Sequence, residues 1–166
     1  MTAWSSSNNG SREHYEVVVV GGGQAGLAMG HFLAREGHRF VLLERSADVG
    51  PAWRERWDSL TLFTPRRYSA LPGLPLPGDP DGYPTRNEVI AYLRRYAETL
   101  ELPIELNSEV QKLEASDGSF ILELNDRTIA ALVTVPAVCR IPYETACSVF
   151  IPRSTSSLTR LRMNTW

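Results

Sequence analysis

The pattern of apolar and polar positions predicts an α/β unit near the start of the chain. Residues 15–20 end in four consecutive valines, which are β-branched and apolar on both faces, as in a strand buried inside a parallel sheet. Apolar positions at helical spacing follow over 24–36, and Gly37 suits the left-handed position that ends a helix. A second apolar run covers 39–43. These segments predict a strand, a crossover helix and a second parallel strand, about 30 residues in all.

The middle of the chain has a different pattern. Seven of the eleven prolines lie between residues 51 and 84, and we expect a long packed loop over 45–84. Thr85 and Glu88 have the spacing of a capping box, and the apolar positions after them predict a helix up to Leu100. A short strand is expected at 104–106. Three further strand-like runs with turn residues between them predict an antiparallel meander, at 109–115, 120–124 and 128–135.

The six residues that follow the first strand, GGGQAG from Gly21, satisfy the pattern G-x-G-x-x-G. The pattern is weak alone, but here it follows a buried strand and opens a helix, as a dinucleotide-binding turn does. Gly21 permits the tight turn, Gly23 lets a pyrophosphate approach the backbone, and Gly26 lets the helix pack closely on the strand. The anion would lie at the helix N-terminus, so the candidate site includes Gln24 and Ala25. A turn that serves packing alone is the alternative interpretation.

An acidic residue, Glu44, ends the second strand 18 residues after Gly26. A carboxylate there can accept hydrogen bonds from ribose hydroxyls and repels a 2′-phosphate, so the site should prefer FAD or NAD to NADP. The alternative is that Glu44 is one of many surface carboxylates. The later elements, a proline-rich loop, one helix and a meander, differ from the alternating strands and helices of an NAD dehydrogenase. This order favours FAD.

Composition narrows the class of protein. The chain has 166 residues and a mass of 18.5 kDa, which suits one domain. A net charge of −2 argues against nucleic-acid binding. Two cysteines and three histidines without metal-ligand spacing predict no metal site. Apolar runs are too short to span a bilayer and the N-terminus lacks the pattern of a signal peptide, so we expect a cytoplasmic protein without membrane contact.

Several longer motifs resemble one known family. They are the segment VVVVGGGQAGLAMGHFLAREGHRFVLLER, the G-x-x-W of Gly50–Trp53, the segment RWDSLTLFTP, and YPTRNEVIAYLRRYAETLELPIELNSEV. Together they are similar to the N-terminal part of flavin-containing monooxygenases and their Baeyer–Villiger-type relatives, over residues 15–133. The whole series is specific, whereas the glycine motif by itself is not.

The resemblance implies an α/β fold: a Rossmann-like FAD-binding domain of the glutathione-reductase type with a β-meander, incomplete at its C-terminus. It also implies an FAD-dependent, NADPH-using monooxygenase that acts on a small-molecule substrate. Trp53 could stack on the flavin or only anchor the loop, and Arg66 and Arg67 could steer a phosphate, although a solvated charged pair is favoured. The residues implied to bind FAD are Gly21, Gly23, Gln24, Ala25 and Gly26 at the pyrophosphate, Glu44 and Arg45 at the ribose, Gly50 and Trp53 at the flavin end, and Val110 at the adenine.

The end of the chain departs from the family pattern. Residues 132–137 lack the A-T-G segment of the family, and neither the F-x-G-x-x-x-H fingerprint nor a second G-x-G-x-x-G for NADPH is present. The first 126 residues carry 18 acidic and 12 basic side chains, whereas the last 40 carry one and five. We therefore hypothesise that the reading frame is lost between about residues 127 and 137, and that the strand closing the FAD sheet is missing.

These observations predict three parts: a flexible leader over 1–14, a partial FAD-binding domain over 15–135, and a poorly specified, out-of-frame tail over 136–166. The chain would then be a truncated N-terminal portion of a monooxygenase, inactive alone. The alternatives are a fragment that only binds FAD, and another FAD oxidoreductase such as an amine oxidase or a reductase.

Overall fold

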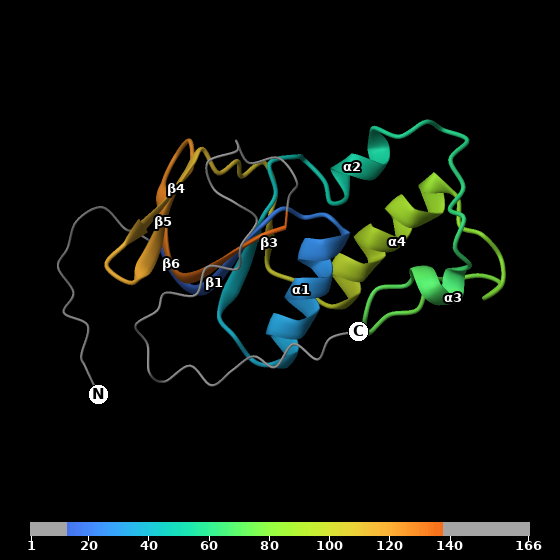
Figure 1. The fold of residues 1–166 in the computed structure, drawn as a ribbon, viewed down its shortest axis with the longest axis horizontal. Helices are drawn as coiled ribbons and strands as arrows, with labels where there is room; N and C mark the ends of the chain where they lie inside the picture. The colour runs from blue at the N-terminus through green and yellow to red at the C-terminus, as the bar shows by residue number, and fades with distance from the viewer. Residues whose placement is uncertain (1–12, 138–166) are drawn as a thin grey trace.

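The structure is a computed structural model, and it describes residues 13–137 (Figure 1). The expected leader and tail therefore lie almost wholly outside the described residues. The elements are β1 (Glu13–Val20), α1 (Gln24–Arg35), β2 (Phe40–Leu43), α2 (Pro51–Arg54), α3 (Arg66–Ser69), α4 (Arg86–Thr99), β3 (Ile104–Glu105), β4 (Lys112–Ser116), β5 (Ser119–Glu123) and β6 (Thr128–Pro136).

The strands form one six-stranded sheet in the order β3-β2-β1-β6-β5-β4. The strands β3, β2, β1 and β6 run parallel, and β5 and β4 continue the sheet as an antiparallel hairpin. β1 pairs with β2 from Val17↔Phe40 to Val20↔Leu43. The predicted α/β fold with a meander is therefore confirmed, with parallel strands at its centre.

The strand β6 has a role that the sequence did not predict. Its first half pairs antiparallel with β5, from Phe120↔Ala131 to Glu123↔Thr128, as a meander strand should. Its other edge pairs parallel with β1 over nearly its whole length, from Glu13↔Ile129 to Val20↔Pro136. With nine residues, β6 is long enough to pair with both β5 and β1. The expectation that a closing strand is missing stays a prediction.

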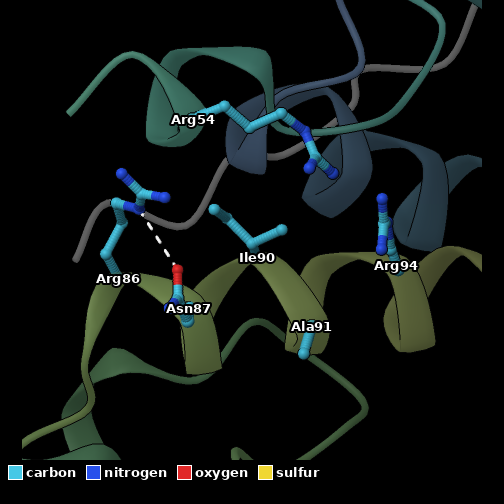
Figure 2. A pocket seen from close by; sticks show the side chains of 6 residues that line it. All are labelled: Arg54, Arg86, Asn87, Ile90, Ala91 and Arg94. Atoms are coloured by element: carbon cyan, nitrogen blue, oxygen red, sulfur yellow. Dashed lines mark hydrogen bonds between the residues drawn. The ribbon is translucent and has the colours of Figure 1, made fainter. Parts of the chain in front are cut away.

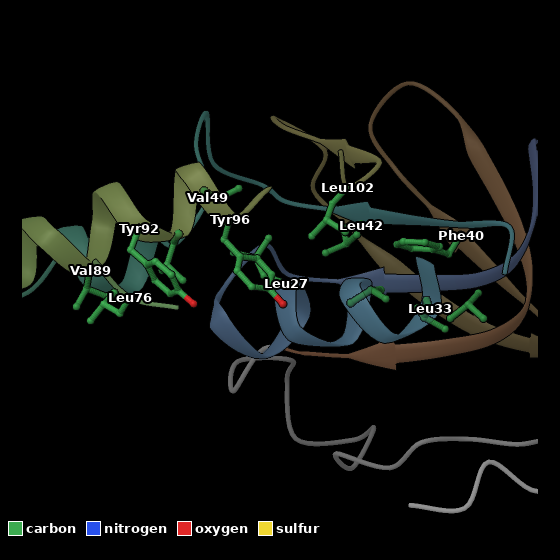
Figure 3. Close-up of a cluster of buried hydrophobic side chains, with 13 residues drawn as sticks. Leu27, Leu33, Phe40, Leu42, Val49, Leu76, Val89, Tyr92, Tyr96 and Leu102 are labelled. Carbon is green, nitrogen blue, oxygen red and sulfur yellow. The ribbon is translucent and has the colours of Figure 1, made fainter. Parts of the chain in front are cut away.

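Hydrophobic side chains cover both faces of the sheet. On one face, Val17 and Val19 pack with α1 and α4, and this cluster continues to Leu27 and Tyr96 (Figure 3). On the other face, Val18 packs with side chains of the meander such as Leu122. Successive side chains of a strand point to opposite faces, so the run of valines supplies both clusters. This explains why β1 carries no polar residue in its second half.

The helix α4 begins as the sequence predicts. The Thr85 hydroxyl accepts a hydrogen bond from the Glu88 N–H, and the Glu88 side chain accepts one from the Thr85 N–H at 2.8 Å. The long loop before it contains the short helices α2 and α3, which its sequence did not predict. Two tyrosines of α4 hold this loop: the Tyr92 hydroxyl donates to Leu74 O at 2.7 Å, and the Tyr96 hydroxyl donates to Pro72 O at 2.5 Å.

Candidate cofactor-binding site

The glycine turn joins β1 to α1 and is shaped by two close approaches. Gly21 has a φ of +111°, which side-chain-bearing residues rarely adopt, and its N–H donates to Leu43 O at 2.8 Å. A Cβ at Gly26 would lie 1.9 Å from Gly21 O. Glycine at these two positions is therefore required by the fold itself, as the sequence predicts for the tight turn and for the close packing of helix on strand.

Gly23 differs from its neighbours. It has an ordinary extended conformation with a φ of −80°, and a Cβ built on it would meet no atom within 4 Å. No contact among the described residues therefore demands glycine here. The open space lies at the N-terminus of α1, where no side chain caps the helix. The first two residues of the helix, Gln24 and Ala25, are exposed. The backbone N–H groups of a first helical turn have no partner within the helix, so this turn can bind an anion.

Glu44 is buried, with 3% of its surface exposed, and each of its carboxylate oxygens accepts a backbone hydrogen bond. Oε2 accepts from the Gly22 N–H at 2.7 Å, and Oε1 accepts from the Ser46 N–H at 2.8 Å. A carboxylate can accept about four hydrogen bonds, so it retains capacity for the ribose hydroxyls. The alternative of a surface carboxylate is wrong. Part of the role of Glu44 is to hold the glycine turn, which the sequence alone did not show.

The backbone around Glu44 joins three segments. The Glu44 N–H donates to Glu105 O at 2.9 Å, and Glu44 O accepts from the Ser108 N–H at 2.9 Å. The segment after β3 is thereby brought beside the end of β2. Val110 lies two residues further on, half-buried against the cluster on the meander face. Arg45, next to Glu44, is exposed. The roles of Val110 at the adenine and of Arg45 at the ribose stay predictions.

Gly50 connects the glycine turn to α2. Its N–H donates to Gly22 O at 2.9 Å, and it adopts a left-handed conformation with a φ of +65°. A Cβ at this position would lie 2.7 Å from Leu93 Cδ1 of α4. Trp53 is half-buried and packs against the core cluster between α1 and α4. The structure therefore brings Gly50 beside the glycine turn, and it supports the interpretation of Trp53 as an anchor.

Two residues that contact the site, Ser46 and Ala137, were not predicted from the sequence. Ser46 binds Glu44, and nothing in a lone serine after a strand marks that contact. Ala137 follows β6, and its N–H donates to Val20 O at 2.8 Å. A Cβ built on Gly26 would lie 3.5 Å from the Cβ of Ala137, so Ala137 packs beside the glycine turn. The segment that lacks the family's A-T-G thus still reaches the position beside the turn.

The expectation of a solvated pair at Arg66 and Arg67 is wrong for Arg66. Arg66 is not solvated: its side chain is 11% exposed, and Nη2 donates to Glu88 Oε1 at 2.5 Å. It also lies against Gly78, where a Cβ would approach its Nε to 2.7 Å. Arg67 forms an ion pair with Asp81. Arg66 therefore holds the proline-rich loop against α4, whereas Arg67 and Asp81 are both exposed, as expected for a solvated charged pair.

Within residues 13–137, no group of histidine, cysteine, aspartate and glutamate side chains could hold a metal ion. In the same part of the chain, every helix is too short or too polar to cross a bilayer. What these residues offer is a turn for an anion, a buried carboxylate for hydroxyl groups, and a short helix tied beside them. This arrangement suits the binding of a nucleotide cofactor.

The chain is similar to several known proteins. Among curated relatives, an uncharacterized CzcO-like oxidoreductase of Geobacillus kaustophilus is 46% identical over 122 residues, and the probable indole-3-pyruvate monooxygenase YUCCA7 of Arabidopsis thaliana is 40% identical over 95 residues. These matches cover 74% and 57% of this chain, but 35% and 22% of the relatives. The chain therefore spans about a third or less of their length.

A solved structure of a monooxygenase is also similar to this chain over part of its length. The flavin-containing monooxygenase of Stenotrophomonas maltophilia matches with a TM-score of 0.72 and 38% identity, over 75% of this chain and 38% of that one. The family profile described as pyridine nucleotide-disulphide oxidoreductase matches residues 18–139. The chain belongs to this family of oxidoreductases, and within it resembles the flavin-containing monooxygenases.

Proposed function

We propose that this chain is the FAD-binding part of an FAD-dependent, NADPH-using monooxygenase that acts on a small-molecule substrate. The observation that carries the proposal is the open space at Gly23, which lies at the uncapped N-terminus of α1. A buried carboxylate, Glu44, is hydrogen-bonded to the same turn. A dinucleotide needs both features, one for its pyrophosphate and one for its ribose.

The residues divide the work of binding. The backbone N–H groups at Gly23, Gln24 and Ala25 would hold the pyrophosphate, and Glu44 would accept hydrogen bonds from the ribose hydroxyls. Gly50 fixes the start of α2 beside the turn through Gly22 O. Bound FAD would supply the redox and oxygen chemistry, while the protein binds and orients it.

The choice of FAD for this site follows from charge and from relatives. A second negative group, such as the 2′-phosphate of NADP, would be repelled by the Glu44 carboxylate. The relatives that are at least 38% identical and named for an activity are monooxygenases. This favours a monooxygenase over an amine oxidase or a disulfide reductase. The second G-x-G-x-x-G motif that the resemblance implies for NADPH is absent from residues 13–137.

A fluorescence titration tests the proposal. The full 166-residue chain is titrated into FAD, and flavin fluorescence and retention of FAD through a desalting column are measured for the wild type and for Gly23→Val. A Cβ at this position meets no atom outside the neighbouring residues within 4 Å, so the variant should keep the urea midpoint of the wild type. We expect the wild type to retain FAD and the variant to lose it. Equal retention by both would refute the assignment of the pyrophosphate site.

A second measurement concerns activity. We propose that the chain alone binds FAD without consuming NADPH, because its matches cover only 35% and 38% of the longer relatives. NADPH oxidation and oxygen uptake are followed together with FAD present. Stoichiometric consumption of both by the purified chain would refute this part of the proposal and leave the FAD site standing.

A further inference from the structure

A cavity of about 320 Å³ lies between α2 and α4, apart from the glycine turn and Glu44 (Figure 2). It carries three guanidinium groups, and no carboxylate is among the side chains that line it. Figure 2 shows Arg54 reaching in from α2, while the other two arginines come from α4. The lining residues are Arg54, Arg86, Asn87, Ile90, Ala91 and Arg94.

Two of the arginines are held in place by one carboxylate behind them. Arg94 donates from Nε to Asp48 Oδ2 at 2.7 Å, and both Arg94 and Arg54 form ion pairs with that same oxygen. The other oxygen, Oδ1, accepts from the Val49 N–H at 2.8 Å. Asp48 thus faces two positive charges and orients both, and Glu98 adds a second negative charge that interacts with Arg94.

The third arginine, Arg86, is fixed separately. Its Nη1 donates to Arg56 O at 2.6 Å, and its Nε donates to Asn87 Oδ1 at 3.3 Å. It also pairs with Asp58, whose side chain is 93% exposed, whereas the side chain of Arg86 is only 16% exposed. Water screens an exposed carboxylate strongly. The cavity therefore keeps a positive charge near Arg86 as well.

The remaining donors of these side chains suit a phosphate. A guanidinium has about five N–H donors in a fixed fork that matches phosphate oxygens, and the partners named above use only some of them. Ile90 adds an apolar side chain between the charged groups (Figure 2). We propose that this cavity binds the phosphate group of an organic ligand. The proposal does not depend on the FAD site, since none of its lining residues belongs to that site.

Two sources could supply such a phosphate: a free organic phosphate, or the 2′-phosphate of NADPH. Inorganic phosphate is the first probe, titrated into the full chain at low ionic strength and followed by isothermal calorimetry and thermal unfolding. NADPH and NADH are then compared. Binding of NADPH that exceeds that of NADH would identify the 2′-phosphate, and equal weak binding of both with saturable phosphate binding would indicate a separate ligand.

The decisive variant is Asn87→Asp. It keeps a side-chain oxygen for Arg86 Nε and leaves Asp48 with both of its arginines, but it places a negative charge in the cavity. The position lies in the first turn of α4, where a carboxylate favours the helix, so the variant should fold. We expect phosphate affinity to fall at least about tenfold, with FAD retention unchanged.

A matched control is Arg35→Gln on α1, which removes an exposed arginine that pairs with its neighbour Glu36 and stacks over Phe32. It should bind phosphate as the wild type does. Phosphate binding that is not saturable, or that is the same in Asn87→Asp and the wild type, would overturn the proposal. If the wild-type chain binds phosphate but does not retain FAD, the proposed function is refuted and the phosphate site stands.

Discussion

The backbone N–H of Gly22 donates a 2.7 Å hydrogen bond to Oε2 of Glu44, and this buried contact helps to hold the glycine turn against the end of β2. The same turn accepts a hydrogen bond from Gly50 through Gly22 O. The middle residue of the turn therefore links the position proposed for the ribose to the start of α2. Binding and local stability depend on the same carboxylate.

Replacing Glu44 should test this double role. Glu44→Ala leaves the N–H groups of Gly22 and Ser46 without their acceptor in a buried place. We expect a loss of about 1–3 kcal/mol in the free energy of unfolding, measured by urea denaturation without FAD, and a loss of FAD affinity. Glu44→Gln keeps one acceptor oxygen, so its free energy of unfolding should lie between those of the wild type and Glu44→Ala. An unchanged urea midpoint in Glu44→Ala would contradict the structural role.

Gly26 and Gly23 should respond differently to the same substitution. In Gly26→Ala the new Cβ would lie 1.9 Å from Gly21 O, a backbone atom that cannot move freely. We expect a cost of about 1–3 kcal/mol or more, seen as a lower melting temperature or insoluble protein. Gly23→Ala is the matched control, since its Cβ meets nothing within 4 Å. Equal stability of the two variants would show that the turn is not packed as described.

The start of α2 offers a test of strain and packing together. Gly50→Ala places a side chain in a left-handed conformation and sets its Cβ 2.7 Å from Leu93 Cδ1. Gly37→Ala has a similar φ of +75° but no atom within 4 Å, so it should show the backbone cost alone, about 1–2 kcal/mol. We expect Gly50→Ala to lose more stability in urea denaturation. The close approach to Leu93 would be refuted if both variants lost the same amount.

Asp48 should make stability depend on pH. The hydrogen bond from Arg94 is the main cause that holds the pKa of Asp48 below its usual value. Because the folded pKa is the lower one, the stabilisation is complete above the unfolded pKa and is lost as the pH falls through the folded value. We expect urea midpoints to decline below about pH 4. Glu16 and Glu88, whose pKa values are also lowered, act in the same direction.

Asp48→Asn supplies the comparison for that pH dependence. The amide cannot titrate, so the variant should be less stable at neutral pH and should show a shallower decline in acid. Parallel curves for the two proteins would mean that Asp48 contributes nothing to the acid sensitivity.

Local patterns predicted the parts of this structure that depend on neighbouring residues. The valines of β1, the glycine turn and the Thr85–Glu88 capping box each need only a few adjacent positions, and each was found. The position of Glu44 at the end of β2 followed from the same spacing. These features are short, and their periodicity or turn chemistry is strong.

The parts that were missed depend on contacts between distant segments. Nothing near Arg66 in the sequence indicates that Gly78 and Glu88 enclose it. The second edge of β6 pairs with a strand at the other end of the domain, and strand periodicity gives a side-chain face, not a partner. Ser46 was also missed, because it contacts Glu44 through its backbone N–H, which its side chain does not reveal.

The pairing of β6 with β1 has a consequence for synthesis on the ribosome. Residues 21–127 separate the two strands, so the edge of β1 that faces β6 has no partner until residue 136 has emerged. At typical translation speeds this interval lasts roughly 5–20 s. An apolar strand with an open edge can pair with other chains, so the nascent protein passes through a period of vulnerability to aggregation that ends only when its last described strand arrives.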